Sequence, residues 1–179
     1  MTGLPDLNPD DEVQVEEIEH AAPLTERSFA RRTALQVLYE LDCTDHLMGE
    51  VMEARIRAQE MDKRGARYVR WLVTGVLKKR ERLDNIIRQY ATEWPLEQVA
   101  IIDRNILRMA LYELAVMQTV NVGTAIDEAA GLASVFGSES SPAFVNGVLG
   151  KMALRLDELR VQLADPDDAD FVAGESEDE

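Results

Sequence analysis

The sequence has little of the chemistry that many enzymes and secreted proteins use. It contains one cysteine, Cys43, and two histidines, His20 and His46. A single cysteine excludes an internal disulfide and fits a reducing compartment, so we expect a cytoplasmic protein. The histidines fall in an acidic N-terminal stretch and in an expected loop, which argues against a histidine-based metal site.

Long uncharged apolar runs and nucleotide-binding glycine motifs are also missing. No uncharged apolar run approaches the ~20 residues of a membrane span, and the acidic start differs from the basic start of a secretory signal. The sequence has neither GxxxxGK[ST] nor GxGxxG after a strand, and no histidine is placed to activate Cys43. We therefore expect a binding protein rather than an enzyme, without a cofactor, a metal or a membrane anchor.

The formal net charge of −15 is concentrated at the two ends of the chain. Residues 1–26 and residues 165–179 each carry eight acids and no Lys or Arg, whereas the part between them carries 18 acids and 19 bases. Acidic ends without apolar periodicity cannot offset the entropy lost on ordering. We predict acidic disordered tails over residues 1–24 and 165–179, and one helical domain over residues 25–164. The tails serve either solubility or competition with an anionic ligand.

Apolar residues recur at helical spacing between the tails and predict an all-α domain without strands. Seven helices are expected, over residues 25–42, 49–59, 63–90, a short turn after Pro95, 102–116, 122–136 and from Ser141 onward. The range 102–116 is apolar around most of its circumference, so we expect two small bundles that share it as a buried central helix. Gly75 predicts a close helix–helix approach. Ser141 is predicted as an N-cap and Pro142 as the first helical residue.

Basic and aromatic side chains are the remaining candidates for function. Single-stranded RNA is held by Arg and Lys on its phosphates and by aromatic rings that stack on unpaired bases. Helical spacing places Arg27 and Arg31 on one stripe that continues past the apolar part of the first helix. Taken singly, each candidate is also explained by an ordinary solvated surface or by core packing, so the residues alone leave RNA binding as one hypothesis among several.

Four segments closely resemble the NusB family of bacterial transcription antitermination factors. They are ARRTALQVLYELD (30–42), IDRNILRMALYEL (102–114), AIDEAAGLASVFGSE (125–139) and FVNGVLGK (144–151). Their order and spacing are those of the family, over roughly residues 29–156. The resemblance implies the all-helical NusB fold. It also implies binding, together with the small-subunit ribosomal protein NusE, to boxA RNA of nascent ribosomal RNA transcripts. This assembly helps the transcribing RNA polymerase complex, with other Nus factors, to pass termination signals.

The same resemblance implies contact residues. RNA contacts are expected at Arg27, Arg31, Arg32, Tyr90, Arg108, Phe144 and Asn146, and NusE contacts at Tyr39 and Asp103. Ser28 and Phe29 stand at positions that are often basic in the family, so the arginine segment is thinned here. Two alternatives stay open: a NusB-like protein-interaction scaffold with weak or no RNA binding, and a module related to the N-terminal domains of RNA cytosine methyltransferases. A monomer and a homodimer are both compatible with the sequence.

Overall fold

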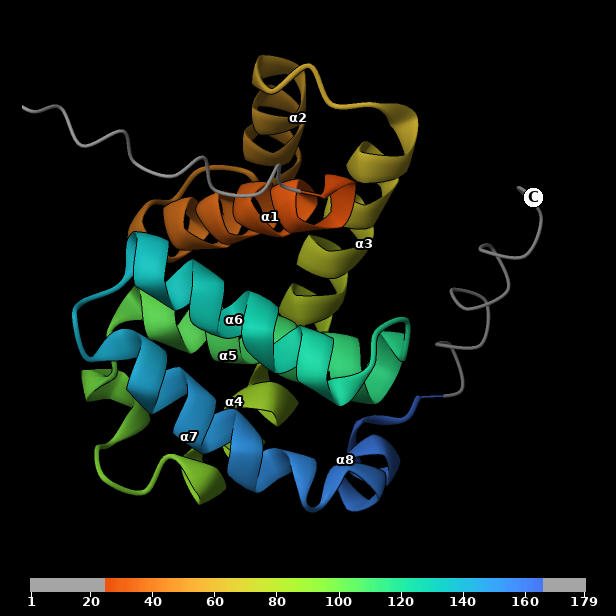
Figure 1. The fold of residues 1–179 in the computed structure, drawn as a ribbon. Helices are drawn as coiled ribbons and strands as arrows, with labels where there is room; N and C mark the ends of the chain where they lie inside the picture. The colour runs from red at the N-terminus through yellow and green to blue at the C-terminus, as the bar shows by residue number, and fades with distance from the viewer. Residues whose placement is uncertain (1–24, 166–179) are drawn as a thin grey trace, which may run out of the picture.

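The computed structural model describes residues 25–165, and this part of the chain folds into helices without a strand (Figure 1). The α-helices are α1 (Glu26–Cys43), α2 (Met48–Ala58), α3 (Lys63–Lys78), α4 (Arg80–Tyr90), α5 (Ile101–Tyr112), α6 (Val122–Phe136), α7 (Ser141–Ala153) and α8 (Leu156–Leu163). A 3-10 turn, Leu96–Gln98, precedes α5, and a π-helical turn, Glu113–Met117, extends it. The all-α prediction is confirmed.

The predicted acidic tails fall largely outside the described residues. Asp165 is the exception, because its carboxylate accepts hydrogen bonds from Lys79 Nζ at 2.8 Å and from Arg82 at 3.1 Å. The first residue of the predicted C-terminal tail therefore belongs to the helical domain. Among the described residues, no helix is long and apolar enough to cross a membrane.

The single helix predicted over residues 63–90 is two helices that join at Lys79. The backbone of Lys79 leaves the helical region, with φ −100° and ψ 10°. Its buried ammonium also donates to the carbonyl oxygen of Leu163 at 2.8 Å, at the C-terminal end of α8, where a cation is favoured by the helix dipole. The apolar stripes on either side of Lys79 share one arc, so periodicity alone does not reveal the joint. The helix predicted from Ser141 onward is also two helices, α7 and α8.

Helix α5 is the buried centre that the sequence predicts. It contacts α1, α3, α4, α6 and α7, and Figure 1 shows it running behind α6 between an upper group (α1–α3) and a lower group (α4, α7 and α8). Nearly all of its length is buried, including its polar side chains Asp103, Asn105 and Arg108. The two predicted bundles therefore share one helix, and that helix brings charged groups into the core.

Gly75 marks the closest approach between α3 and α5. A Cβ atom at this position would overlap the ring and hydroxyl of Tyr112. Tyr112 is itself buried at the C-terminal end of α5, so its ring has little room to move away. The glycine predicted to allow a close helix contact does so.

We predict that Gly75→Ala lowers the free energy of unfolding by about 1–3 kcal/mol, because the added methyl group overpacks the α3–α5 contact. Urea unfolding followed by circular dichroism measures the change. Gly131→Ala in α6 is the matched control, since nothing lies within 4 Å of its added Cβ. That control should gain up to about 1 kcal/mol from helix propensity. A Gly75→Ala protein as stable as Gly131→Ala would contradict the contact.

Candidate nucleic-acid interface

The two aromatic side chains predicted to bind RNA, Tyr90 and Phe144, line one surface cleft. Tyr90 is the last residue of α4 and Phe144 lies in the first turn of α7, so the cleft forms where these helices meet. Both rings are half-buried against the core. Lys151 of α7 lines the same cleft and adds an exposed ammonium group. Aromatic rings beside a cation suit an unpaired, negatively charged strand.

Asn146 is exposed on α7 but does not line this aromatic cleft. It follows Phe144 by two residues, a rotation of roughly 200° around a helix, so the two side chains project to different sides. Asn146 therefore lies outside the cleft, and its predicted RNA contact stays a prediction.

Two of the three predicted arginines of α1 reach the surface. Arg27 is exposed and donates to the carbonyl oxygen of Thr119 at 3.2 Å, and its guanidinium lies 5.6 Å from the centre of the Tyr68 ring. Arg32 is half-buried and lies 5.9 Å from the centre of the Phe136 ring, in a groove between α1 and α6. Both guanidinium groups stack on aromatic rings, which holds their charge in place at the surface.

A short segment of chain connects the surroundings of Arg32 to the aromatic cleft. Phe136, which packs beneath Arg32, is the last residue of α6. The turn over residues 137–140 then leads into α7, and Ser140 at its end lines the cleft of Tyr90 and Phe144. Arg32, this turn and the cleft therefore follow one another along the connection from α6 to α7, and together we call them the RNA band.

Arg31 does not project past the edge of the fold, and this expectation is wrong. Its side chain is 2% exposed and its Nε donates to both carboxylate oxygens of Glu113, at 2.9 and 3.1 Å. It also donates to the hydroxyl of Tyr68 at 3.2 Å and pairs with Glu128 at 3.4 Å. Burial, followed by the charge of Glu113, raises the pKa of Tyr68, so this phenol stays protonated and donates a hydrogen bond to Glu113. Arg31 therefore ties α1 to the core.

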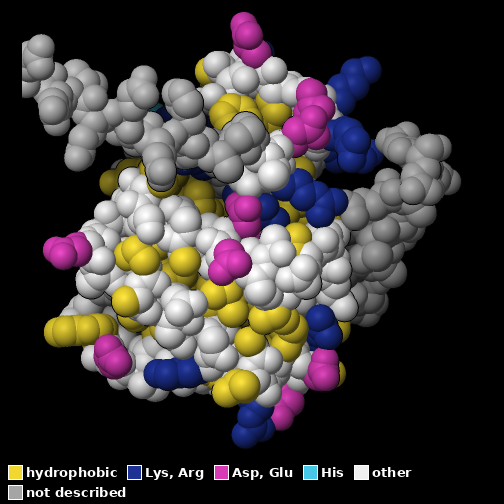
Figure 2. Space-filling model, viewed as in Figure 1, with side chains coloured by type: hydrophobic (Ala, Val, Ile, Leu, Met, Phe, Trp, Pro, Cys, Tyr) yellow, Lys and Arg dark blue, Asp and Glu magenta, His cyan; other side chains and the backbone are white. Residues whose placement is uncertain are grey.

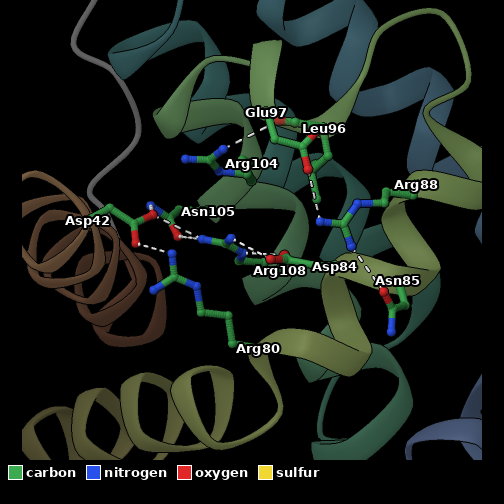
Figure 3. A network of polar contacts seen from close by, with 10 residues as sticks. All are labelled: Asp42, Arg80, Asp84, Asn85, Arg88, Leu96, Glu97, Arg104, Asn105 and Arg108. Carbon is green, nitrogen blue, oxygen red and sulfur yellow. Dashed lines mark hydrogen bonds and ion pairs between the residues drawn. The ribbon is translucent and has the colours of Figure 1, made fainter.

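Arg108 is likewise enclosed, and the structure does not support its predicted RNA contact. It is 2% exposed and makes a bidentate pair with Asp84 of α4, at 2.7 and 2.8 Å. A third bond runs to Asp42 of α1 at 3.0 Å, and Asp42 in turn pairs with Arg80 at 2.8 Å. Figure 3 shows this network, with Asn105 bridging Asp42 and Arg108. Its geometry is that of a buried structural cluster.

The two predicted NusE contacts have different surroundings. Tyr39 of α1 is 42% exposed and lines a mainly apolar groove with Leu35, Ile102 and Phe136. Asp103 is only 7% exposed and accepts a hydrogen bond from the Ser141 hydroxyl at 2.9 Å. Tyr39 is therefore accessible at the surface, whereas Asp103 lies beneath it.

The predicted start of α7 is wrong by one residue. Ser141 is the first residue of the helix rather than its N-cap, and Ser140 at the cap position makes no side-chain cap bond. Instead, the Ser141 hydroxyl accepts from the backbone N–H of Ser138 at 2.9 Å. Burial raises the pKa of Asp103, although the bond from Ser141 opposes this shift.

Comparison with known proteins decides the family. The model of the NusB family matches residues 28–154. The chain belongs to the NusB family. Transcription antitermination protein NusB of Chloroflexus aggregans is 40% identical over 133 residues, which cover 73% of this chain and 89% of the relative. The protein of the same name from Halothermothrix orenii is 44% identical over 131 residues, 70% of this chain and 94% of the relative.

Solved NusB structures share the fold. NusB of T. maritima matches with a TM-score of 0.66 and 26% identity, over 82% of this chain and 98% of that chain. A chain in the crystal structure of the antitermination factors NusB and NusE in complex with dsRNA gives a TM-score of 0.67 and 26% identity, over 73% of this chain and 97% of that chain. The NusB match begins at residue 28, so Arg27 lies just before it.

Three residues that lie beside the predicted contact residues were not identified from the sequence. Phe136 lies beneath Arg32 and also lines the Tyr39 groove, which only the packing of α6 on α1 reveals. Arg64 and Arg67 line a cleft with Arg27. Their spacing of three residues on one helix face is a signal that the sequence does contain.

We predict that Arg31→Ala lowers the free energy of unfolding by about 3–5 kcal/mol, because Glu113 would keep an uncompensated charge in the core. Arg32→Ala removes the same charge from a half-buried position and serves as the control. Urea denaturation compares the two, and the Arg32 variant should remain within about 1 kcal/mol of the unchanged protein. Equal midpoints for the two variants would refute the structural role of Arg31.

Asp103 should make a pH-dependent contribution to stability. Because its pKa is raised in the folded state, its contribution is most favourable at low pH and becomes less favourable as the pH rises above about 4, the ordinary pKa of aspartate. Asp103→Asn removes this titration. The variant should therefore gain stability relative to the unchanged protein between pH 4 and pH 7 in thermal unfolding. A constant difference across that range would contradict the raised pKa.

Proposed function

We propose that this protein is a transcription antitermination factor that binds boxA-type single-stranded RNA of nascent ribosomal RNA transcripts together with NusE. In this role it joins the transcribing RNA polymerase complex and other Nus factors in the cytoplasm and helps the polymerase pass termination signals. It acts by binding and carries out no catalytic step. The single observation that carries the proposal is membership of the NusB family, whose relatives are named transcription antitermination proteins.

The RNA band supports this function. Arg32 would contact phosphates, which adds a salt-dependent and sequence-tolerant contribution to the affinity. Tyr90 and Phe144 would stack on unpaired bases, each stack contributing roughly 1–3 kcal/mol. Lys151 lies in the same cleft and would contact the backbone next to the stacked bases. Arg31 and Arg108 are left out of this surface because their guanidinium groups are enclosed by carboxylates.

A neighbouring groove is the proposed NusE site. Tyr39 stands exposed above apolar walls made by Leu35, Ile102 and Phe136. Phe136 belongs to this groove and also supports Arg32, so the two surfaces adjoin. A NusE molecule seated here would extend the RNA band, and binding of either partner would then strengthen binding of the other by the same factor. A related chain is solved with NusE and dsRNA, which is consistent with such a joint surface.

Fluorescence anisotropy with a labelled boxA RNA tests the proposal. The protein should bind boxA RNA more tightly than a scrambled RNA of equal length, and NusE should increase the ratio of the two affinities. NusE binding without any preference for boxA would instead identify a protein-interaction scaffold. Absence of binding to both NusE and RNA would refute the proposed function.

Two substitutions separate the two surfaces. Phe144→Ala should weaken boxA binding about 5- to 150-fold, the equivalent of one lost stack of roughly 1–3 kcal/mol, and leave NusE binding unchanged. Tyr39→Ala should weaken NusE binding and leave boxA binding unchanged when NusE is absent. Titration of each variant with each partner, after thermal melts confirm folding, gives four affinities. The opposite pattern would show that the surfaces are assigned wrongly.

A further inference from the structure

A second basic surface lies beside the N-terminal end of α1. Here α1 and the first three turns of α3 enclose a cleft. Its lining residues are Glu26, Arg27 and Ala30 from α1, and Arg64, Gly65, Arg67, Tyr68 and Trp71 from α3. None of the residues from α3 belongs to the RNA band or to the NusE groove.

The α3 residues present their charge on one side of the helix. Arg64, Arg67 and Trp71 are spaced by three and four residues, so they lie on one face. Arg27 of α1 brings a third guanidinium group to the same cleft, against the single carboxylate of Glu26. At the N-terminal end of α3, the Asp62 carboxylate accepts from the backbone N–H of Gly65 at 2.8 Å and offsets the partial positive charge of the helix dipole there. Figure 2 shows Lys and Arg side chains gathered over this region of α1 and α3.

The floor of this cleft is aromatic. Tyr68 is buried beneath Arg27, whose guanidinium lies 5.6 Å from the ring centre, and Trp71 is half-buried. The cleft holds about 170 Å³. Pockets for small molecules measure roughly 300–1,000 Å³, so this volume suits part of a passing chain better than an enclosed cofactor. Arginines above aromatic rings are the combination that binds unpaired nucleic acid.

We propose that this α1–α3 cleft binds the phosphate backbone of single-stranded RNA that continues beyond the boxA segment. The inference rests on the proposed function and adds a second contact region to it. Arg27 belongs to the cleft and stands on the same helix as Arg32, five residues away, or about 7.5 Å along the axis. Five residues also turn roughly 140° around the helix, so a strand leaving the RNA band would pass over α1 to reach the cleft.

The internal pairing of Arg31 makes the α3 arginines important. Of the three arginines in the first turns of α1, Arg31 is enclosed by Glu113 and Glu128, so only Arg27 and Arg32 reach the surface. Arg64 and Arg67 are exposed on α3 and supply the basic charge that α1 does not. The extended contact is therefore made by two helices rather than by the first helix alone.

The test uses the full chain with NusE and two RNAs, a boxA core and the same core extended by unpaired uridines at either end. The extended RNA should bind more tightly. Arg64→Gln combined with Arg67→Gln should abolish this advantage while core binding is unchanged. The dependence of log affinity on log salt for the extended RNA should become shallower by about 0.7 per arginine removed. Arg57→Gln in α2 replaces an exposed arginine outside the cleft. It is the control and should leave the affinity for both RNAs unchanged.

Tryptophan fluorescence locates the added contact. The chain has two tryptophans, and Trp94→Phe leaves Trp71 as the only one. Extended RNA, but not core RNA, should change the emission of Trp71 in this variant. No change on binding of extended RNA would overturn the proposed position of the strand.

The remaining outcomes separate this inference from the proposed function. Core binding with no advantage for the extended RNA would refute the cleft as an RNA site and leave the proposed function intact. Failure of the core to bind, with NusE present, would refute the proposed function itself. A third result would assign the cleft to the acidic residues 1–24 of this chain instead: the extended RNA has no advantage with the full chain but gains one when those residues are removed.

Discussion

Neutralisation of the charges carried by the central helix is the constraint on which the rest of the structure depends. Helix α5 and its π-helical extension bring Arg108 and Glu113 into the core, where an unpaired charge would be strongly unfavourable. Asp84 and Asp42 enclose Arg108, and Arg31 encloses Glu113. Because these partners come from α1 and α4, the same pairs fix both helices against α5.

This pairing also decides which basic residues remain for an external ligand. Arg31 and Arg108 stand in a sequence rich in arginine, and both are directed inward by carboxylates at 2.7–3.0 Å. Arg27 and Arg32 rest instead on aromatic rings at the surface. The proposed RNA surface is therefore a narrow band beside a structural charge cluster, and neighbouring arginines on one helix have different roles.

The proposed partner sites adjoin through shared aromatic side chains. Phe136 supports Arg32 and lines the Tyr39 groove, while Tyr68 lies beneath Arg27 and donates to Glu113 in the core. Ligands on either surface would thus contact side chains that are packed against the core, which holds the surfaces in place before binding. Preorganised sites of this kind lose less entropy when a strand binds.

The sequence by itself determined the helical class, the central position of α5 and the close approach at Gly75, because apolar periodicity and a missing side chain are local properties. Its motifs also identified the family. Tyr90, Phe144 and Tyr39, which those motifs suggest as contact residues, line surface clefts. Only the tertiary structure decided the joint at Lys79 and the burial of Arg31, Arg108 and Asp103. Their partners Glu113, Asp84 and Ser141 lie 24 to 82 residues away along the chain. No local pattern shows whether a charged side chain on a helix meets water or a distant carboxylate, since that depends on how the helices pack.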